Sequence, residues 1–397
     1  MVRSVLLVGP YSKQGTYTNP PTGLLYLHAM LRANDVPVDW VDENQHDVID
    51  VTQHDIIGIQ MMTSNRHRAL HIAKAAKDAG KFVVVGGPHP TLMWKQVLEN
   101  YPYIDLCVIG DGEYPLLDIA QGKQPAFIPG VAWRNGREIA HTTRNLNWSL
   151  DALPLPSFDA VDFSRYVGGA RVFYSRGCGH GKCIFCSVAA QWGPQRWRSV
   201  DNMIQEMQWL KDLGQSGFAL YDDCMTCDRD RAAALFQAMI DNDLTGMWWC
   251  CTTRVSAVDP DIIALMKRAG CQEVTFGVET AHPEAMKIYA KGQTVEQAEN
   301  AIAWCKQVGL RCSVLMIYNG IRAGQYDGFT KQWVAKMGVG EGSANELQIF
   351  PATPLYRAMV DHGFMDDSFW LGPEPFGIYH GQLDHLEPRD WAKYHVC

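Results

Sequence analysis

The sequence contains no long apolar run. No stretch approaches the roughly 18 to 20 apolar residues of a membrane span, and the first ten residues hold only the short run Val5 to Val8. Positive charge is also scarce, because 35 Lys and Arg face 43 Asp and Glu, for a formal net charge of -8. A protein that binds along a phosphate backbone normally carries a basic stripe. We therefore expect a cytoplasmic protein with no membrane partner and no nucleic-acid partner.

The composition shows no bias towards disorder or low complexity. With 397 residues, 47% of them hydrophobic and 20% charged, the chain exceeds one typical core, and two domains are expected. The chain has twelve cysteines and no recognisable signal peptide, so we expect a reducing compartment, where clustered cysteines more often bind metal than form disulfides. The spacing of the cysteines is then more informative than their number.

Short apolar runs alternate with helical patterns in the first part of the chain. The expected strands are 4–9, 38–42, 56–61, 82–87 and 105–110, and the expected helices are 23–34, 66–79, 92–100 and 114–120. This alternation predicts a doubly wound, Rossmann-like or flavodoxin-like domain over residues 1–125, which binds its ligand at the carboxyl ends of the parallel strands. The candidate binding residues at those ends are Pro10, Thr63, Ser64, Gly86, Gly87, His89, Gly110, Gly112 and Glu113.

A second alternation follows a proline-containing stretch, 126–168, which is expected to link two domains. The expected strands are 171–175, 217–221, 247–252, 273–278, 311–317 and 346–350, separated by helices near 200–213, 229–241, 260–269, 294–308 and 324–336. Six such units predict a partial (βα)6 barrel over 169–355, with its chemistry at the carboxyl ends of the strands. Residues 356–397 are expected to form a capping tail.

Three cysteines follow the first strand of this second domain. Cys178, Cys183 and Cys186 lie within nine residues, in a loop that also contains several glycines. Soft thiolates at this spacing suit an iron-sulfur cluster or zinc. Three ligands would leave one iron of a four-iron cluster open to a substrate or cofactor, whereas His180 would complete a Cys3His zinc site. The spacing alone leaves both sites open.

The cysteine loop resembles the signature of the radical SAM superfamily, although its spacing is C-x4-C-x2-C where the family usually has C-x3-C-x2-C. The resemblance implies that Cys178, Cys183 and Cys186 hold a 4Fe-4S cluster whose open iron binds S-adenosylmethionine (SAM), from which a 5'-deoxyadenosyl radical is made. It also implies that Phe185 packs near adenine and that Ser187, in the same motif, contacts the cofactor.

Other strand ends resemble segments of the same family. Asp222 and Asp223 end the second strand, Arg254 follows the third, and Glu279 ends the fourth in the sequence Phe-Gly-Val-Glu-Thr. Phe350 stands at the expected exit of the sixth. The resemblance makes all five cofactor-contact candidates, with a helix N-cap as the alternative for the aspartates and a surface salt bridge for Arg254 and Glu279. The fifth strand end, 319–325, departs from the family's usual sequence.

The first domain resembles the cobalamin-binding domain that precedes many of these barrels, through segments 20–27, 86–91 and 110–113. The D-x-H-x-x-G motif that supplies a histidine below cobalt in other cobalamin proteins is absent. His89 could face the corrin ring, but a histidine in such a loop is more often structural or solvated.

The chain is therefore identified as a member of the cobalamin-dependent radical SAM family. The resemblance implies three cofactors (a 4Fe-4S cluster, SAM and cobalamin), a flavodoxin or ferredoxin as electron donor, and a small molecule or peptide as substrate. The expected reaction is transfer of a methyl group from methylcobalamin to an unactivated carbon or to phosphorus. The alternatives are a rearrangement, ring contraction or cyclisation without methyl transfer, and a zinc-stabilised, non-catalytic cobalamin sensor.

Two further cysteine groups lie near expected strand ends. Cys224 and Cys227 form C-x2-C after the second strand, and Cys250 and Cys251 are adjacent in the third. An auxiliary cluster or thiol chemistry on the substrate is one interpretation of these groups. The default interpretation is buried, unreactive cysteines.

Overall fold

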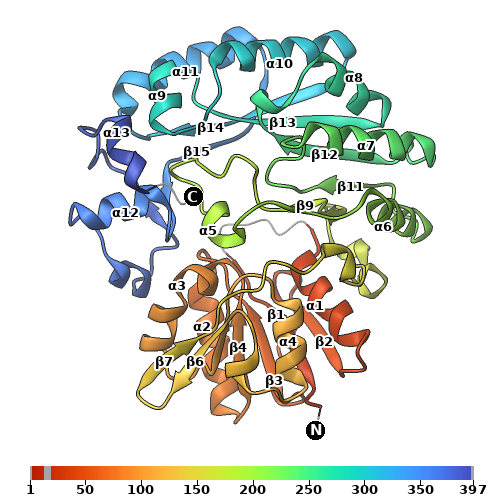
Figure 1. Cartoon of the computed structure of the whole chain (residues 1–397), viewed down its shortest axis with the longest axis vertical. Coiled ribbons are helices and arrows are strands. Elements are labelled where there is room, and N and C mark those ends of the chain that lie inside the picture. The colour runs from red at the N-terminus through yellow and green to blue at the C-terminus, as the bar shows by residue number, and fades with distance from the viewer. Residues whose placement is uncertain (1, 13–18, 395–397) are drawn as a thin grey trace. The chain divides into compact units, whose positions relative to one another are not determined.

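The computed structural model describes residues 2–12 and 19–394, and the chain divides into two compact units (Figure 1). Unit 1 comprises Met1–Ala170 and Trp370–Pro375, and unit 2 comprises Arg171–Phe369 and Phe376–Cys397. The stretch 126–168, which we expected to link two domains, belongs to unit 1. The expected C-terminal tail contributes residues to both units.

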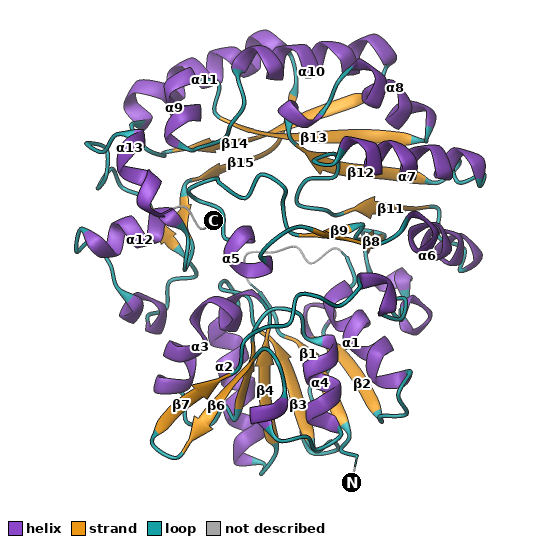
Figure 2. Ribbon diagram, in the orientation of Figure 1, coloured by secondary structure: helices purple, strands orange, loops and turns teal. Residues whose placement is uncertain are grey.

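Unit 1 is built on a seven-stranded sheet in the order β2-β1-β3-β4-β5-β6-β7 (Figure 2). The first five strands in this order are parallel, and their order is that of flavodoxin-like doubly wound sheets. The strands are β1 (Val5–Gly9), β2 (Val38–Asp42), β3 (Ile56–Gln60), β4 (Phe82–Gly86), β5 (Leu106–Val108), β6 (Val131–Asn135) and β7 (Glu138–His141). The helices between them are α1 (Thr22–Arg32), α2 (Arg66–Asp78), α3 (Pro88–Asn100) and α4 (Glu113–Ala120). The expected doubly wound domain is thereby confirmed.

The core of unit 1 forms because continuous apolar strands meet apolar helix faces. Val5 and Leu7 of β1 and Ile56 of β3 are fully buried, and they share one cluster with Leu24 of α1 and Leu116 of α4. Strands that are buried on both faces read as uninterrupted apolar runs, which is why their positions could be predicted.

The hairpin of β6 and β7 is an addition that the sequence analysis missed. Both strands pair antiparallel, β6 with β5 and β7 with β6, and Asn135 pairs with Glu138 across a two-residue turn. Gly136 in that turn has φ 66°. Glycine at the first position of a two-residue turn is a hairpin signal, and it could have revealed these strands within the supposed linker.

Unit 2 is built on a six-stranded sheet in the order β15-β14-β13-β12-β11-β8. Each strand lies beside the next one along the chain, and the four pairs from β11 to β15 are parallel. The strands are β8 (Ala170–Val172), β11 (Gly217–Leu220), β12 (Trp248–Thr253), β13 (Cys271–Glu279), β14 (Arg311–Tyr318) and β15 (Gly340–Glu346). This is the winding of a partial βα barrel.

Helices connect these strands, and several of them begin at a side-chain cap. The main helices are α6 (Val200–Asp212), α7 (Arg229–Asp241), α8 (Pro260–Arg268), α10 (Val295–Val308) and α11 (Ala323–Met337), with the shorter α5 (Val188–Trp192), α9 (Pro283–Ile288), α12 (Pro354–Asp361) and α13 (Pro388–Trp391). Asp228 caps α7, and Thr294 begins α10 with a capping box. Caps of this kind fix the first residue of a helix and hence the length of the loop between the preceding strand and that helix.

The expected sixth barrel strand at 346–350 was placed wrongly. The sixth strand is β15, which ends at Glu346, whereas β16 (Gln348–Ile349) pairs antiparallel with β17 (Gly377–Ile378) in a separate sheet. β15 is largely solvent-exposed and polar, so it carries none of the apolar pattern that marks the other strands. A further two-stranded sheet pairs β9 (Ser175–Arg176) with β10 (Arg196–Trp197). Among the described residues, no helix is long and apolar enough to cross a membrane.

Candidate active site

The three thiols of the cysteine motif lie on one loop, between β9 and α5. Cys178, Cys183 and Cys186 are all free of disulfide bonds and partly buried, and the backbone N–H of Cys186 donates to the carbonyl of Cys183 at 3.1 Å. In the described part of the chain, no three His, Cys, Asp or Glu side chains are gathered closely enough to hold a metal ion. The fit to an iron-sulfur cluster therefore rests on donor chemistry, namely three soft thiols on one glycine-containing loop.

His180, the candidate fourth zinc ligand, is engaged elsewhere. Its Nε2 donates to the backbone carbonyl of Ala290 at 2.7 Å, and burial lowers the pKa of the imidazole to about 4. The ring also packs so closely on Gly292 that a Cβ there would lie 2.7 Å from it. The neutral ring thus packs within the fold, and this arrangement gives no support to a Cys3His zinc site.

Two of the thiols, Cys183 and Cys186, are disposed to remain protonated until a metal binds. Burial raises the pKa of Cys183, with Lys291 and Arg254 opposing that shift, and burial raises the pKa of Cys186 to about 12. Since a thiol must lose its proton to ligate metal, cluster assembly on this loop is coupled to proton release.

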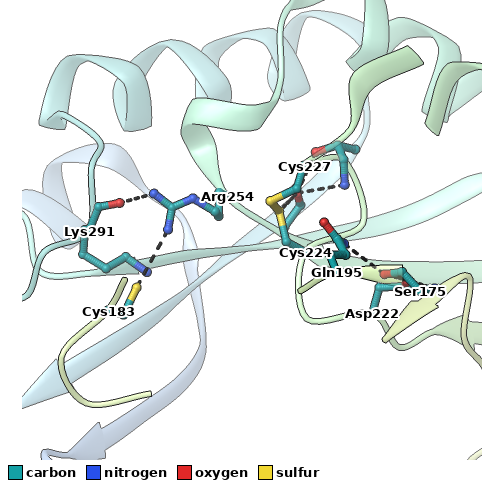
Figure 3. Close-up of a disulfide and its surroundings, with 10 residues drawn as sticks. Ser175, Cys183, Gln195, Asp222, Cys224, Cys227, Arg254 and Lys291 are labelled. Carbon is teal, nitrogen blue, oxygen red and sulfur yellow. Dashed lines mark hydrogen bonds between the residues drawn. A yellow bond between two sulfur atoms is a disulfide. The ribbon is translucent and has the colours of Figure 1, made fainter. Parts of the chain in front are cut away.

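Two cations and a carboxylate lie beside this loop, and Figure 3 shows the two cations, Arg254 and Lys291, next to Cys183. Nη1 of Arg254 lies 3.9 Å from Sγ of Cys183, and the guanidinium also donates to the backbone carbonyl of Lys291. Nζ of Lys291 lies 3.3 Å from Oε1 of Glu279, and the side chains of this ion pair are only 5% and 12% exposed. Nζ of Lys291 also lies 5.8 Å from the ring centre of Phe185. The structure therefore brings Arg254, Glu279 and Phe185 together through Lys291, which the sequence analysis did not select.

The backbone at Glu279 explains why its segment reads Gly-Val-Glu. Glu279 ends β13 with φ 68°, and the pairing with β14 shifts register between Gly277 and Glu279. A Cβ at Gly277 would lie 3.1 Å from Oε1 of Glu279, so glycine leaves room for the carboxylate. Such left-handed backbone in a non-glycine residue costs free energy and is concentrated at functional sites.

The carboxylate of Asp222 accepts hydrogen bonds from residues just before the cysteine loop. It accepts the N–H groups of Tyr174 and Ser175 at 3.0 and 2.5 Å and the hydroxyl of Ser175 at 2.6 Å. Burial raises its pKa to about 6. Asp222 thus anchors the chain that leads into the loop. The next residue, Asp223, is exposed overall, but its carboxylate accepts from the backbone N–H of Gly177 in the loop, and burial of that group raises its pKa to about 6.

The other expected residues of unit 2 are more dispersed. Ser187 is the residue before α5, and its carbonyl accepts from the N–H of Gln191 at 2.9 Å. Phe350 follows β16 rather than a barrel strand, and its ring lies 5.9 Å from that of Phe376. The structure does not connect Phe350 with the Arg254–Lys291–Glu279 network through any described contact.

In unit 1 the expected binding residues fall at the carboxyl edge of the sheet. A parallel sheet ordered β2-β1-β3-β4-β5 reverses its winding between β1 and β3, and ligands bind in the crevice at such a switch point. Pro10 follows β1, and Thr63 and Ser64 follow β3. The side chain of Asn65 donates to the carbonyl of Pro10 at 3.4 Å and so ties the two strand ends together.

Glycines stand at the same edge after β4 and β5. Gly87 has φ 104°, and a Cβ there would lie 3.1 Å from the carbonyl oxygen of Met61. Gly110 has φ 87° and donates its N–H to the hydroxyl of Thr91 at 3.0 Å. Glycine is required at both positions by the positive φ and by close packing on Met61 and Arg144, and both stand at the edge where doubly wound sheets bind their ligands. Gly86 ends β4, and Gly112 and the buried Glu113 stand at the start of α4.

His89 is buried in α3 near the switch point. Its N–H donates to the carbonyl of Met61 at 3.1 Å, its Nδ1 lies 3.4 Å from Oγ1 of Thr63, and its ring meets Trp370 edge-on at 6.2 Å. Burial lowers the pKa of the imidazole to about 3. The packing around this ring fits the structural interpretation of His89 better than that of a solvated loop residue.

Arg66 was missed by the sequence analysis, although it is 1% exposed. Its guanidinium donates to the carbonyls of Thr63 at 2.8 Å, Trp370 at 2.9 Å, Gly372 at 2.8 Å and Pro375 at 3.1 Å, and to that of Glu374. This one side chain holds residues 370–375 in unit 1 across some 300 residues of sequence. Contacts between residues so far apart in the sequence leave no local pattern from which they could be predicted.

Comparisons with known proteins agree with both halves of this description. The family model for the radical SAM superfamily matches residues 172–323, and the model for the B12 binding domain matches residues 14–120. The chain is 32% identical over 336 residues to an uncharacterized methyltransferase, PH0819, of Pyrococcus horikoshii, covering 78% of this chain and 72% of that protein. It is 28% identical over 326 residues to the anaerobic magnesium-protoporphyrin IX monomethyl ester cyclase of Rubrivivax gelatinosus, covering 77% of this chain and 56% of that protein.

A solved structure has the same fold. The radical SAM methyltransferase TsrM of Kitasatospora setae, with cobalamin and a [4Fe-4S] cluster bound, superposes with a TM-score of 0.78 at 19% identity, covering 91% of this chain and 78% of that one. With two family models matched in order and a relative above 30% identity across most of both chains, the family is established. The chain belongs to the cobalamin-dependent radical SAM enzymes, whose cofactors are a 4Fe-4S cluster, SAM and cobalamin.

Proposed function

We propose that this enzyme transfers a methyl group to an unactivated carbon or to phosphorus. The observation that carries the proposal is the presence, on one chain, of a flavodoxin-like sheet with glycines at its carboxyl edge and a three-thiol loop backed by Arg254, Lys291 and Glu279. The relative with the highest identity reported above is named a methyltransferase, which favours this reaction.

In this proposal the residues beside the cysteine loop have separate tasks. Cys178, Cys183 and Cys186 hold the cluster, and Arg254 and Glu279 supply opposite charges for the carboxylate and ammonium groups of SAM. When bound, SAM and the cluster supply the radical, and cobalamin carries the methyl group.

Lys291 and Phe185 support this arrangement. Lys291 compensates the charge of Glu279, and Phe185, edge-on to the buried ring of Tyr289 at 5.8 Å, provides an apolar surface near the loop. Fixed charges in a place with little water act more strongly than they would in solution.

The substrate class and the electron donor are further parts of the proposal. A chain of net charge -8 suits a small molecule or a peptide better than a polynucleotide. A flavodoxin or ferredoxin is the donor that the family resemblance implies, because radical formation needs one electron at low potential.

Product analysis tests the reaction type. The anaerobically reconstituted enzyme, supplied with hydroxocobalamin, a strong reductant and SAM deuterated in its methyl group, would be offered pools of small metabolites and peptides. Methyl transfer predicts a deuterated product together with both S-adenosylhomocysteine and 5'-deoxyadenosine. A variant with Cys186→Ala should form no 5'-deoxyadenosine.

A second candidate is a reaction without methyl transfer, which the likeness to a named cyclase favours. It predicts 5'-deoxyadenosine and a rearranged or cyclised product, with no deuterium gained and no S-adenosylhomocysteine formed. The same assay therefore separates the two reactions.

A further inference from the structure

Cys224 and Cys227, which the proposed reaction does not use, form a disulfide in the loop between β11 and α7. Neither interpretation drawn from the sequence included this bond. The loop is held from one side by the end of β12, because the N–H of Met225 donates to the carbonyl of Thr252 at 3.1 Å and the hydroxyls of Thr226 and Thr253 lie 2.6 Å apart. Arg254, which faces Cys183, is the next residue along.

On its other side the disulfide meets the cysteine loop. A Cβ placed on Gly179 would lie 3.3 Å from Cβ and 3.9 Å from Sγ of Cys227, and Gly179 follows the first cluster cysteine, Cys178. The disulfide thus lies between the first turn of the cysteine loop and the strand end that carries Arg254. Figure 3 shows the disulfide together with Arg254 and Cys183.

The two sulfurs differ in ways that matter for exchange. Cys224 is fully buried, and its Sγ lies 3.6 Å from the hydroxyl of Thr253. Cys227 is partly exposed and stands two residues before α7, a 13-residue helix. The amino end of a helix lowers the pKa of a nearby thiol, and C-x2-C pairs in this position exchange readily with other thiols. In the described part of the chain, the adjacent Cys250 and Cys251 are not bonded to each other.

We propose that Cys224 and Cys227 are a redox-active pair that a dithiol reductant opens and closes reversibly. A thiolate of the reductant attacks Sγ of Cys227, the bond to Cys224 breaks, and Cys224 takes up a proton as it leaves. The second thiol of the reductant then attacks the mixed disulfide and releases Cys227. The chain gains two electrons and two protons, and the reductant leaves as its own disulfide.

Reduction of the disulfide changes the packing against the cysteine loop. Two unbonded sulfurs must separate to van der Waals distance, and the buried Cys224 has less freedom to move than Cys227, which borders Gly179. Reduction is therefore expected to loosen residues 177–186. The redox activity of the pair does not depend on the proposed function. Its effect on a bound cluster does, because that effect assumes that the cysteine loop holds one.

The redox state of the pair can be measured by mass spectrometry in the full-length chain. Trypsin releases it within peptide 212–229, which contains no other cysteine, while Cys250 and Cys251 fall in peptide 232–254 and provide an internal control. The chain is equilibrated natively with graded ratios of reduced to oxidised dithiothreitol and alkylated. Peptide 212–229 should pass from no label to two labels in one two-electron step, while the control peptide shows no such paired step.

Labelling of both cysteines across the whole series would overturn the proposal, because no disulfide would form. So would a disulfide that persists in native chain under excess reduced dithiothreitol, because the bond would then be only structural. In Cys224→Ser, oxidised glutathione should modify Cys227 at least tenfold faster than it modifies Cys224 in Cys227→Ser, and the reverse order would overturn the assignment of the attacked sulfur. Hydrogen exchange in 177–186 should be several-fold faster in the reduced chain, and equal rates would refute the link to the cysteine loop.

Discussion

The buried ion pair between Lys291 and Glu279 gives the sharpest prediction about the site. In Lys291→Met, the contact from Arg254 to the backbone carbonyl of residue 291 can remain, so the substitution removes only the ammonium group. The Glu279 carboxylate, 12% exposed, is then left without its partner. Removing one member of a buried pair costs about 3–5 kcal/mol, or roughly a 10²- to 10⁴-fold change in the folding equilibrium.

Scanning calorimetry of the cluster-free, full-length chain measures this loss. At about 2–4 °C per kcal/mol for a unit of this size, the transition of unit 2 should fall by about 10 °C. The double variant Lys291→Met with Glu279→Gln should recover most of the loss. Lys336→Met is the matched control, since its pair with Glu299 is 74% and 39% exposed and should contribute less than about 1 kcal/mol. If Lys291→Met and Lys336→Met shift the transition equally, the network does not have the importance assigned to it here.

Three further predictions concern other residues. Gly87→Ala should destabilise unit 1 by about 1–3 kcal/mol in urea unfolding and weaken hydroxocobalamin binding, because φ is 104° and the new methyl would lie 3.1 Å from the carbonyl of Met61; unchanged stability would contradict this. His180→Ala should leave the iron content after reconstitution unchanged, since its Nε2 already donates to Ala290, and loss of bound metal would restore the zinc interpretation. Burial lowers the pKa of His89 to about 3, so this group destabilises the fold as the pH falls from about 6.5, by up to about 1.4 kcal/mol per pH unit. In His89→Gln the free energy of unfolding should fall less steeply between pH 6 and pH 4, and an unchanged slope would refute this.

The parallel strands and the helices of both units were predictable because their signals are local. The helix 229–241 was predicted with the bounds that α7 has, since Asp228 caps it and buried Ala232, Leu235, Phe236 and Met239 repeat at helical spacing. Where that signal is missing the prediction was wrong: β15 is polar and exposed, and an apolar run two residues later was taken for the sixth strand.

The parts of the site that were not predictable depend on contacts between distant residues. Arg254 and Glu279 were selected through family segments, but Lys291 lies outside any strand end and is recognised only by its buried pair. Arg66 reads as one polar residue of a helix until residues 370–375 are placed against it. The C-x2-C spacing of Cys224 and Cys227 was visible, but whether the two sulfurs are bonded depends on the conformation of the loop.

The measurement that tests the central claim most directly is the iron, sulfide, cobalt and zinc content per chain after anaerobic reconstitution with hydroxocobalamin. A cobalamin-dependent radical SAM enzyme predicts roughly four irons and four sulfides, with about one cobalt bound at the carboxyl edge of the sheet in unit 1. Iron without cobalt would contradict the proposed methyl transfer. Zinc in place of iron would contradict the account of the cysteine loop itself.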